Sequence, residues 1–444
     1  MRIKEDGKMK FYDRIQELET LTKNWQQSAE HSMMTTLIGR RRVGKTSLLL
    51  KSVENKPFLY LYVSKDNEQI LCRKFQEQAS STLGIQIYGQ TASFGQLFEE
   101  LMMYGKEHHY TLIIDEFQNF LSINKAIPSV LQDIWDRLKD TTHVNLILCG
   151  SIYSMMKKIF ENSDEPLYGR RDSNMRLLPF TTNTLKEILR DHNPNYQPDD
   201  LLCLYMLTGG VAKYVTLLMD AKANTKQKML KYAFATDSPF LTEGTELMLS
   251  EFGKDYGTYF SILQLIASGM TTQREIDSVI GKNTGAYLGN LYEDYSFISK
   301  NVPLLSKPGT RNIKWHIDDC FLRFWFRFVY PYQGLIESNQ SQLLHQYAAD
   351  NYQQFTGKTL ENYFHAHAMQ TGRFTKIGNW WNRSGENEID MVALNEFDKS
   401  CVIAEIKRNP KRISLTDLQN KVNALPAEFH SYQIVLKALS LEDL

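Results

Sequence analysis

Paired cysteines are missing from this sequence of 444 residues. Its five cysteines lie far apart, and no two of them form a C-x-x-C pair. That spacing excludes a disulfide framework and the common cysteine zinc sites, and it is typical of reduced thiols. A long apolar run is missing too, because no stretch approaches the roughly 18 apolar residues of a membrane span. The polar N-terminus has no signal-peptide pattern, so we expect a cytoplasmic protein without membrane contact.

An excess of charge of one sign is also absent. The chain has 51 Lys and Arg residues against 51 Asp and Glu residues. This balance excludes a surface coated in positive charge, although it leaves room for a local basic face. With 42% hydrophobic and 23% charged residues, the composition is that of a globular protein. At this length we expect about two to four domains.

One glycine-rich motif is present that binds phosphate in other proteins. It has the pattern G-x-x-x-x-G-K-T, and it comprises Gly39, Arg40, Arg41, Arg42, Val43, Gly44, Lys45 and Thr46, with Ser47 next. Backbone N–H groups of such a loop surround phosphate oxygens, the lysine reaches the β- and γ-phosphates, and the threonine hydroxyl binds Mg²⁺. An apolar segment precedes the loop and a helical pattern follows it, as a P-loop requires. The motif predicts binding of ATP with Mg²⁺; the alternative is a glycine-rich surface turn.

A second motif follows the apolar segment 110–114, which ends in Asp115 and Glu116. A segment that is apolar on both faces predicts a central parallel strand, whose last residues reach the sheet edge where a P-loop lies. We expect Asp115 to hold Mg²⁺ through water and Glu116 to act as the general base. The alternative is an acidic pair that only ends a strand. Ser151, at the end of a further β-rich run, is a candidate sensor of the γ-phosphate.

The pattern of strands and helices predicts an α/β protein with several parts. Two β-rich runs after a helix–turn–helix pattern, in which Thr272 and Glu275 form a capping box, predict a winged helix. Lys307, Arg311 and Lys314 near its tip suit DNA phosphates, although such domains also serve in protein contacts alone. The expected parts are a disordered tail (1–8), a P-loop domain of the ASCE type with a parallel sheet (9–178), a helical lid (179–252), a winged helix (253–331), a linker (332–347) and a small α/β domain (348–444).

An aromatic run at 321–328 carries two interleaved arginines, Arg323 and Arg327. Such a run can stack on nucleic acid bases. We expect instead a buried helix that joins the winged helix to its neighbours.

Carboxylates near the C-terminus form a second candidate site. If a hairpin turns between Phe397 and Asp398, Asp390 lies directly opposite Glu405, with the Cβ atoms roughly 5 Å apart. Lys407 then points to the same face as Glu405, and Glu361 on a predicted helix could add another acidic group. Facing carboxylates suit Mg²⁺ or Mn²⁺, and a nearby lysine suits metal-assisted phosphodiester hydrolysis. A solvated ladder of ion pairs is the alternative.

The motifs in this order resemble the archaeal-type ATPase family, which is related to the STAND and AAA-like P-loop ATPases. The resemblance covers nearly the whole chain and rests on the following segments: Phe11-Tyr12-Asp13-Arg14, the P-loop, Ile113-Ile114-Asp115-Glu116, Gly150-Ser151, Leu167-Tyr168-Gly169-Arg170 and Thr208-Gly209-Gly210. Where the family often has proline after the double glycine, this chain has Val211-Ala212. That departure concerns the geometry of the lid.

The C-terminal part resembles the PD-(D/E)xK nuclease superfamily. Members of the ATPase family often carry this C-terminal domain, and its signature here consists of Arg323-Phe324-Trp325, Ile377-Gly378-Asn379-Trp380-Trp381, Glu388-Ile389-Asp390 and Glu405-Ile406-Lys407. This resemblance implies that Asp390, Glu405 and Lys407 bind metal and cleave DNA. The resemblance to the archaeal-type ATPases implies that Arg170 contacts the γ-phosphate. The expected protein is an ATPase whose nucleotide state controls a winged helix and a nuclease-like domain. The alternatives are a STAND-like signalling switch, with nucleotide-dependent homo-oligomers, and a DNA-binding regulator.

Overall fold

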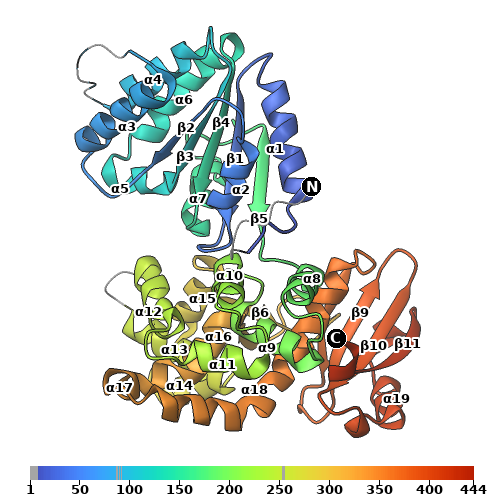
Figure 1. The fold of residues 1–444 in the computed structure, drawn as a ribbon. Coiled ribbons are helices and arrows are strands. Elements are labelled where there is room, and N and C mark those ends of the chain that lie inside the picture. The colour runs from blue at the N-terminus through green and yellow to red at the C-terminus, as the bar shows by residue number, and fades with distance from the viewer. Residues whose placement is uncertain (1–8, 87–88, 90, 92, 253–255) are drawn as a thin grey trace. The chain divides into compact units, whose positions relative to one another are not determined.

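The computed structural model describes residues 9–86, 89, 91, 93–252 and 256–444 (Figure 1). The chain divides into two compact units, one of residues 13–178 and the other of residues 179–444 together with the N-terminal segment up to Tyr12. The predicted tail, residues 1–8, lies outside the described residues. Both units combine helices with a β-sheet.

A parallel sheet forms the centre of unit 13–178. Its strands are β1 (Met33–Gly39), β2 (Phe58–Tyr62), β3 (Tyr110–Asp115), β4 (Val144–Gly150) and β5 (Ser173–Leu177), in the order β2-β3-β4-β1-β5. Strands β1, β3 and β4 are buried along their whole length, because helices cover both faces. The order confirms the predicted α/β P-loop fold, with β4 between the P-loop strand and the strand of Asp115. Strand β5 was not among the predicted strands.

Helices lie on both faces of this sheet (Figure 1). Helices α1 (Ile15–Gln27) and α2 (Lys45–Ser52) share one core with the sheet, to which Leu21, Leu48 and Ile113 belong. Helices α3 (Glu68–Leu83), α4 (Phe94–Tyr104), α6 (Ile127–Leu138) and α7 (Tyr153–Glu161) share the core on the other face. The short elements are η1 (Phe117–Asn119), α5 (Phe120–Ile123) and η2 (Lys139–Thr141).

The second unit begins with helices and continues with a helix–hairpin segment. The helices are α8 (Thr182–His192), α9 (Pro198–Thr208), α10 (Ala212–Asp220), α11 (Lys226–Ala233) and α12 (Pro239–Phe252). The helix–hairpin segment consists of α13 (Gly257–Ser268), α14 (Gln273–Ile280), α15 (Gly285–Glu293), β6 (Ile298–Asn301) and β7 (Lys314–Ile317). Thr272 and Glu275 form the predicted capping box, and β6 and β7 pair antiparallel as expected for the two β-rich runs.

The aromatic run forms the buried helix α16 (Cys320–Phe328). The indole N–H of Trp325 donates a hydrogen bond to the carbonyl oxygen of Leu241, 3.1 Å away. Gly244 packs so closely on this ring that a Cβ atom there would lie 2.1 Å from it. The prediction of a buried helix is therefore confirmed, and its aromatic rings are not available for base stacking.

The prediction of a linker at residues 332–347 is wrong. After η3 (Tyr330–Tyr332), the chain forms α17 (Gln333–Glu337) and the 30-residue helix α18 (Ser341–Gln370). The segment is mostly polar, so its few buried residues with helical spacing, Leu344, Ala348 and Tyr352, were not recognised as one face of a helix. Neither α18 nor any other helix of the described residues is long and apolar enough to cross a membrane.

The C-terminal sheet has the order β11-β10-β9-β8. Its strands are β8 (Lys376–Trp381), β9 (Glu388–Asn395), β10 (Ser400–Lys407) and β11 (Gln433–Ser440), and β10 and β11 are parallel. Helix α18 contacts β8, β9 and β10, while α19 (Leu415–Asn423) packs through Leu418 on the core that contains Ile389. The remaining elements are η4 (Pro410–Arg412), η5 (Ala427–Phe429) and η6 (Leu441–Asp443).

Candidate functional site

The P-loop joins the end of β1 to the start of α2. Gly44 caps α2 with a φ of 101°, a conformation that favours glycine. Lys45 is buried, and its Nζ donates hydrogen bonds to the carbonyl oxygens of Gly39 at 2.7 Å and Arg40 at 3.1 Å. The Lys45 ammonium therefore contacts the backbone of the loop that is predicted to bind phosphate. Thr46 is exposed at the first turn of the helix.

Strands β3 and β4 carry the predicted catalytic residues to the same edge of the sheet. Glu116 follows β3 with a φ of 55°, a strained left-handed conformation for this residue. Its Oε2 accepts a hydrogen bond from Ser151 Oγ at 2.7 Å and another from the side-chain amide of Gln118. The structure thus brings together Glu116 and Ser151, which are 35 positions apart in the sequence.

The P-loop and the acidic pair meet around Cys149, near the end of β4. Burial raises the pKa of the Cys149 thiol well above its usual range, and the negative charges of Asp115 and Glu116 add to this effect. The positive charge of Lys45 acts in the opposite direction on the same thiol. All three predicted residues therefore lie close enough to influence one buried sulfur atom.

Tyr60 of β2 is a site residue that the sequence did not reveal. Its hydroxyl group donates a hydrogen bond to Asp115 Oδ2, and Thr46 also hydrogen-bonds with this hydroxyl. Burial and the contact with Asp115 raise the pKa of Tyr60. Strand β2 pairs parallel with β3, and this pairing sets Tyr62 beside Asp115. A prediction of Tyr60 as a site residue would have required knowledge of that pairing.

Thr46 and Asp115 fit a magnesium ion. Both present hard oxygen atoms around the Tyr60 hydroxyl, and such oxygens are the ligands that Mg²⁺ prefers. Arg41 Nε and Gln118 Oε1 are buried without a hydrogen-bond partner among the described residues. No cluster of three or more His, Cys, Asp or Glu residues that could hold a metal occurs in the part of the chain that the structure describes. The protein residues therefore suit an ion that takes other ligands from nucleotide and water.

Two arginines of unit 13–178 have contacts that the sequence did not predict. Arg170 forms an ion pair with Asp136 of α6, at 2.9 Å, and donates to two carbonyl groups of its own loop. Its predicted role at the γ-phosphate has no support from these contacts. Arg14, which the sequence did not single out as a site residue, is buried and reaches the carbonyl oxygen of Val43 in the P-loop at 3.5 Å.

The second candidate site lines a cavity of about 600 Å³ within the other unit. The hairpin of β9 and β10 has the predicted register, because Leu394 pairs with Cys401 and Met391 with Ala404. Continuing this register places Asp390 opposite Glu405, and the Asp390 carboxylate accepts a hydrogen bond from the backbone N–H of Ile406 at 2.8 Å. The register inferred from the turn is thus confirmed.

Lysines pair with each of the predicted acidic residues. Lys407 Nζ lies 2.8 Å from Asp390 and 3.0 Å from Glu405, between the two carboxylates where a metal ion was expected. Two further lysines were not predicted: Lys421 Nζ lies 2.9 Å from Glu405, and Lys358 Nζ lies 2.6 Å from Glu361.

These contacts shift the pKa values of the groups in the cavity. Burial raises the pKa of Glu361, and the charge of Asp390 adds to this effect. Burial would raise the pKa of Glu405, but its hydrogen bonds with Lys421 and Lys407 outweigh burial and lower it. Burial would lower the pKa of Lys407, but the two carboxylates outweigh burial and raise it. Both pKa shifts favour the charged forms of Glu405 and Lys407.

Lys314, which was expected to contact DNA phosphates, contacts the C-terminal sheet in this structure. Lys314 Nζ lies 3.1 Å from Glu388 and 4.6 Å from the centre of the Trp381 ring. Lys307 and Arg311 line a second cavity beside Trp381. The hairpin tip therefore packs on the C-terminal sheet, and Lys314 does not project freely toward a duplex.

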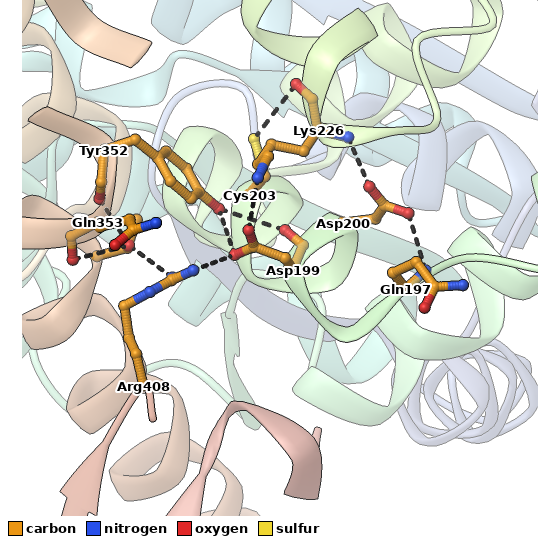
Figure 2. A network of polar contacts seen from close by, with 9 residues as sticks. Gln197, Asp199, Asp200, Cys203, Lys226, Tyr352, Gln353 and Arg408 are labelled. Carbon is orange, nitrogen blue, oxygen red and sulfur yellow. Dashed lines mark hydrogen bonds and ion pairs between the residues drawn. The ribbon is translucent and has the colours of Figure 1, made fainter. Parts of the chain in front are cut away.

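Arg408, directly after Lys407, connects the second site to α9 (Figure 2). Its guanidinium lies 2.8 Å from Asp199 Oδ1 and donates to Thr356 Oγ1 at 2.7 Å. Tyr352 and Lys226 complete the contacts of the Asp199 carboxylate, at 3.0 and 2.8 Å. The end of β10 is thereby fixed to α9 and α18.

Comparison with known proteins gives matches over most of the chain. Residues 11–218 match a family of ATPase domains found predominantly in Archaea, and residues 325–417 match archaeal and bacterial proteins of unknown function. An uncharacterized protein of Methanocaldococcus jannaschii is 31% identical over 408 residues, which are 89% of this chain and 87% of that protein.

Two solved structures have a similar fold. A Walker-type ATPase of Pyrococcus abyssi has a TM-score of 0.54 and 20% identity, and the match covers 71% of this chain and 96% of that one. The ORC2 protein of Aeropyrum pernix, solved as ADPNP–ADP complexes, has a TM-score of 0.50 and 17% identity, with 77% and 96% covered. The resemblance to archaeal-type ATPases is thus confirmed, whereas the nuclease likeness of the C-terminal part stays a prediction. The match of residues 11–218 and the relative that is 31% identical over 89% of this chain show the family. This chain belongs to the family of ATPase-domain proteins found predominantly in Archaea.

Proposed function

We propose that this protein hydrolyses ATP to ADP and phosphate with Mg²⁺ as its cofactor. The observation that carries the proposal is the hydrogen-bonded group of Glu116, Ser151 and Gln118 at the P-loop edge of the sheet. A carboxylate held by two donors keeps a fixed orientation, and a general base needs such an orientation toward the attacking water. The family match over residues 11–218 supports the same activity.

Each P-loop residue has a distinct task in this reaction. The loop from Gly39 to Ser47 surrounds the phosphates, and Lys45 exchanges its carbonyl partners for the β- and γ-phosphates. The oxygen of a water molecule bonds to the γ-phosphorus, the bond from that phosphorus to the β-phosphate oxygen breaks, and Glu116 accepts the water proton. Thr46 and, through water, Asp115 would hold Mg²⁺, which would supply charge neutralisation at the phosphates.

Calorimetric titration with ATP and an assay of phosphate release test this proposal. We expect saturable binding of ATP, and phosphate release in Mg²⁺ that stops in EDTA. A chain that binds no ATP would contradict the assignment of the P-loop. Tight binding with no phosphate release would contradict hydrolysis and favour the signalling switch.

A second proposed function is metal-dependent hydrolysis of DNA at Asp390, Glu405 and Lys407. A specific observation favours it: these side chains from β9 and β10 meet in a cavity that Glu361 also lines. In the reaction, a water oxygen bonds to the phosphorus and the bond to the leaving strand oxygen breaks. Lys407 orients the water or stabilises phosphate charge. The attacking water gives up a proton to bulk solvent, and the leaving oxygen takes up a proton from solvent.

The carboxylates of this cavity fit Mg²⁺ or Mn²⁺ by their chemistry. Asp390 and Glu405 offer hard oxygen ligands on either side of Lys407 Nζ. A metal ion at that point requires Lys407 to turn toward the substrate, and Glu361 becomes a ligand only when it leaves Lys358. The ion, when bound, supplies charge neutralisation at the phosphate.

Cleavage of linear, circular and single-stranded DNA, with and without ATP, tests the second function. We expect wild-type cleavage in Mn²⁺ or Mg²⁺ and a loss of at least about 100-fold in Asp390→Asn. Asp350→Asn, at an exposed position of α18, is the control and keeps wild-type cleavage. Absence of cleavage in every condition would contradict the nuclease proposal. Nucleotide-dependent assembly, seen by light scattering, would then support the signalling switch.

A further inference from the structure

Two arginines of α16 line the same cavity as the acidic residues. Arg323 and Arg327 lie one helical turn apart, so they point to the same side of the helix. The cavity also receives Lys407 and Glu405 from β10. Positive side chains thus approach the acidic group from a different wall of the cavity.

The arginines differ from the cavity lysines in their partners. Lys314, Lys358, Lys407 and Lys421 each pair with a carboxylate. Arg323 donates through Nη2 to the Phe355 carbonyl and Thr359 Oγ1, and Arg327 donates through Nη1 to the Tyr347 hydroxyl. Neither guanidinium pairs with a carboxylate anywhere in the described ranges 9–86, 93–252 and 256–444. Both therefore keep positive charge and spare N–H donors in a shielded place.

The electrostatic environment of the cavity agrees with these unpaired charges. Burial lowers the pKa of His316 to about 3, and the charges of Lys358, Arg323 and Lys314 contribute to the shift. Burial also lowers the pKa of Arg323, although the Glu361 carboxylate opposes this effect. A guanidinium stays protonated in proteins, so this wall of the cavity is positive at every working pH.

We propose that Arg323 and Arg327 bind a backbone phosphate of a single nucleic acid strand that occupies the cavity. Arginine forks match phosphate oxygens in geometry and charge. A volume of about 600 Å³ is in the range of about 300–1,000 Å³ that accepts small ligands, so it fits a few nucleotides rather than a duplex. This inference rests on the second proposed function for its acidic neighbours, and it adds the class of substrate and the residues that hold it.

Binding of fluorescein-labelled octathymidylate in EDTA, followed by anisotropy, tests the inference without cleavage. We expect Arg327→Gln to weaken binding at least about tenfold and to reduce the slope of log K against log salt by about 0.7. Gln354→Glu, an exposed residue that lines the cavity, adds a negative charge without disturbing the core and has the same direction of effect. Arg327→Lys should restore part of the affinity.

Two matched controls lie outside the cavity. Gln353→Glu, the neighbouring exposed position on α18, and Arg373→Gln, an exposed arginine, should stay within about twofold of wild type. A wild-type protein that does not bind the strand, or wild-type affinity in both Arg327→Gln and Gln354→Glu, would overturn the inference. Displacement by thymidine monophosphate or inorganic phosphate as effective as by the strand would overturn the assignment to a strand. Binding with these effects but no cleavage in Mn²⁺ would uphold the arginine site and refute the nuclease.

Discussion

Ser151 Oγ donates a hydrogen bond of 2.7 Å to Glu116 Oε2, linking the ends of two strands of the parallel sheet. Ser151 follows β4 and is buried, whereas Glu116 follows β3 in a left-handed conformation. The carboxylate is therefore oriented by a residue that follows the neighbouring strand as well as by Gln118, which follows its own strand. This relationship makes Ser151 a positioning residue for the proposed base.

Ser151→Ala removes the hydrogen bond and leaves the P-loop intact. A hydrogen bond to a charged group contributes about 1.5–3 kcal/mol, so we expect about 10- to 100-fold slower turnover. The Kd for ATP should change little. A phosphate-release assay beside titration calorimetry measures both quantities. Ser122→Ala, at an exposed hydroxyl, is the control, and equal turnover in both variants would refute the positioning role.

Lys45→Ala should abolish the binding of ATP. The ammonium group is the side-chain cation of the P-loop that reaches the phosphates, and we expect an affinity at least about 100-fold weaker, or about 2.7 kcal/mol. Lys51→Ala, on the same helix but exposed and paired with Glu54, leaves the affinity unchanged. An unaltered Kd in Lys45→Ala would refute the phosphate site.

His316 should make the stability of its unit depend on pH. Its pKa is about 3 in the folded chain, mainly because of burial, and about 6.5 when unfolded. Between these values the unfolded chain binds more protons, so the free energy of unfolding decreases as the pH falls below about 6.5. The decrease at pH 5 is about 2 kcal/mol for this residue.

His316→Asn should therefore flatten the dependence of stability on pH between about 7 and 5. Urea unfolding followed by circular dichroism measures the change. His365, whose pKa burial lowers to about 4, retains part of the dependence in the variant. His430→Asn changes an exposed histidine and keeps the wild-type slope. Equal slopes for His316→Asn and wild type would show that His316 is not the source.

The pair of Asp199 and Arg408 should be energetically coupled. Both side chains are mostly buried, and truncating one leaves the other charge without its partner. We expect Asp199→Asn and Arg408→Gln each to lower the free energy of unfolding by about 2–4 kcal/mol. The double variant should lose at least about 1 kcal/mol less than the sum.

Urea unfolding of the wild type, the two single variants and the double variant measures the coupling energy between Asp199 and Arg408. Glu396→Gln breaks an exposed pair with Lys376 and should lower the free energy of unfolding far less than Asp199→Asn or Arg408→Gln does. Additive losses in the double variant would mean that Arg408 does not hold β10 to α9 through Asp199.

Local patterns predicted those features whose causes lie within a short stretch of sequence. The P-loop, the strand ending in Asp115 and the register of β9 with β10 each depend on neighbouring residues and a turn. The helix Ser341–Gln370 was predicted only in its C-terminal part, around Glu361, because apolar positions are sparse in the polar segment where it begins. Strand β5 was missed because only Met175 and Leu177 of its residues are buried.

Contacts between distant segments could not be predicted from these patterns. Tyr60 meets Asp115 only because β2 pairs with β3, and Lys421 meets Glu405 only because α19 packs beside β10. Arg323 looked like a core residue because aromatic residues surround it in the sequence. Its place in the cavity depends on α18, which supplies its hydrogen-bond acceptors.

Single-turnover hydrolysis of ATP by Glu116→Gln shows most directly whether Glu116 is the catalytic base. We expect the variant to bind ATP with nearly the wild-type Kd in Mg²⁺ and to hydrolyse it about 10²- to 10⁴-fold more slowly, because the water loses its general base. Glu19→Gln on α1, an exposed position, keeps wild-type turnover. Near-normal turnover in Glu116→Gln would show that Glu116 is not the catalytic base.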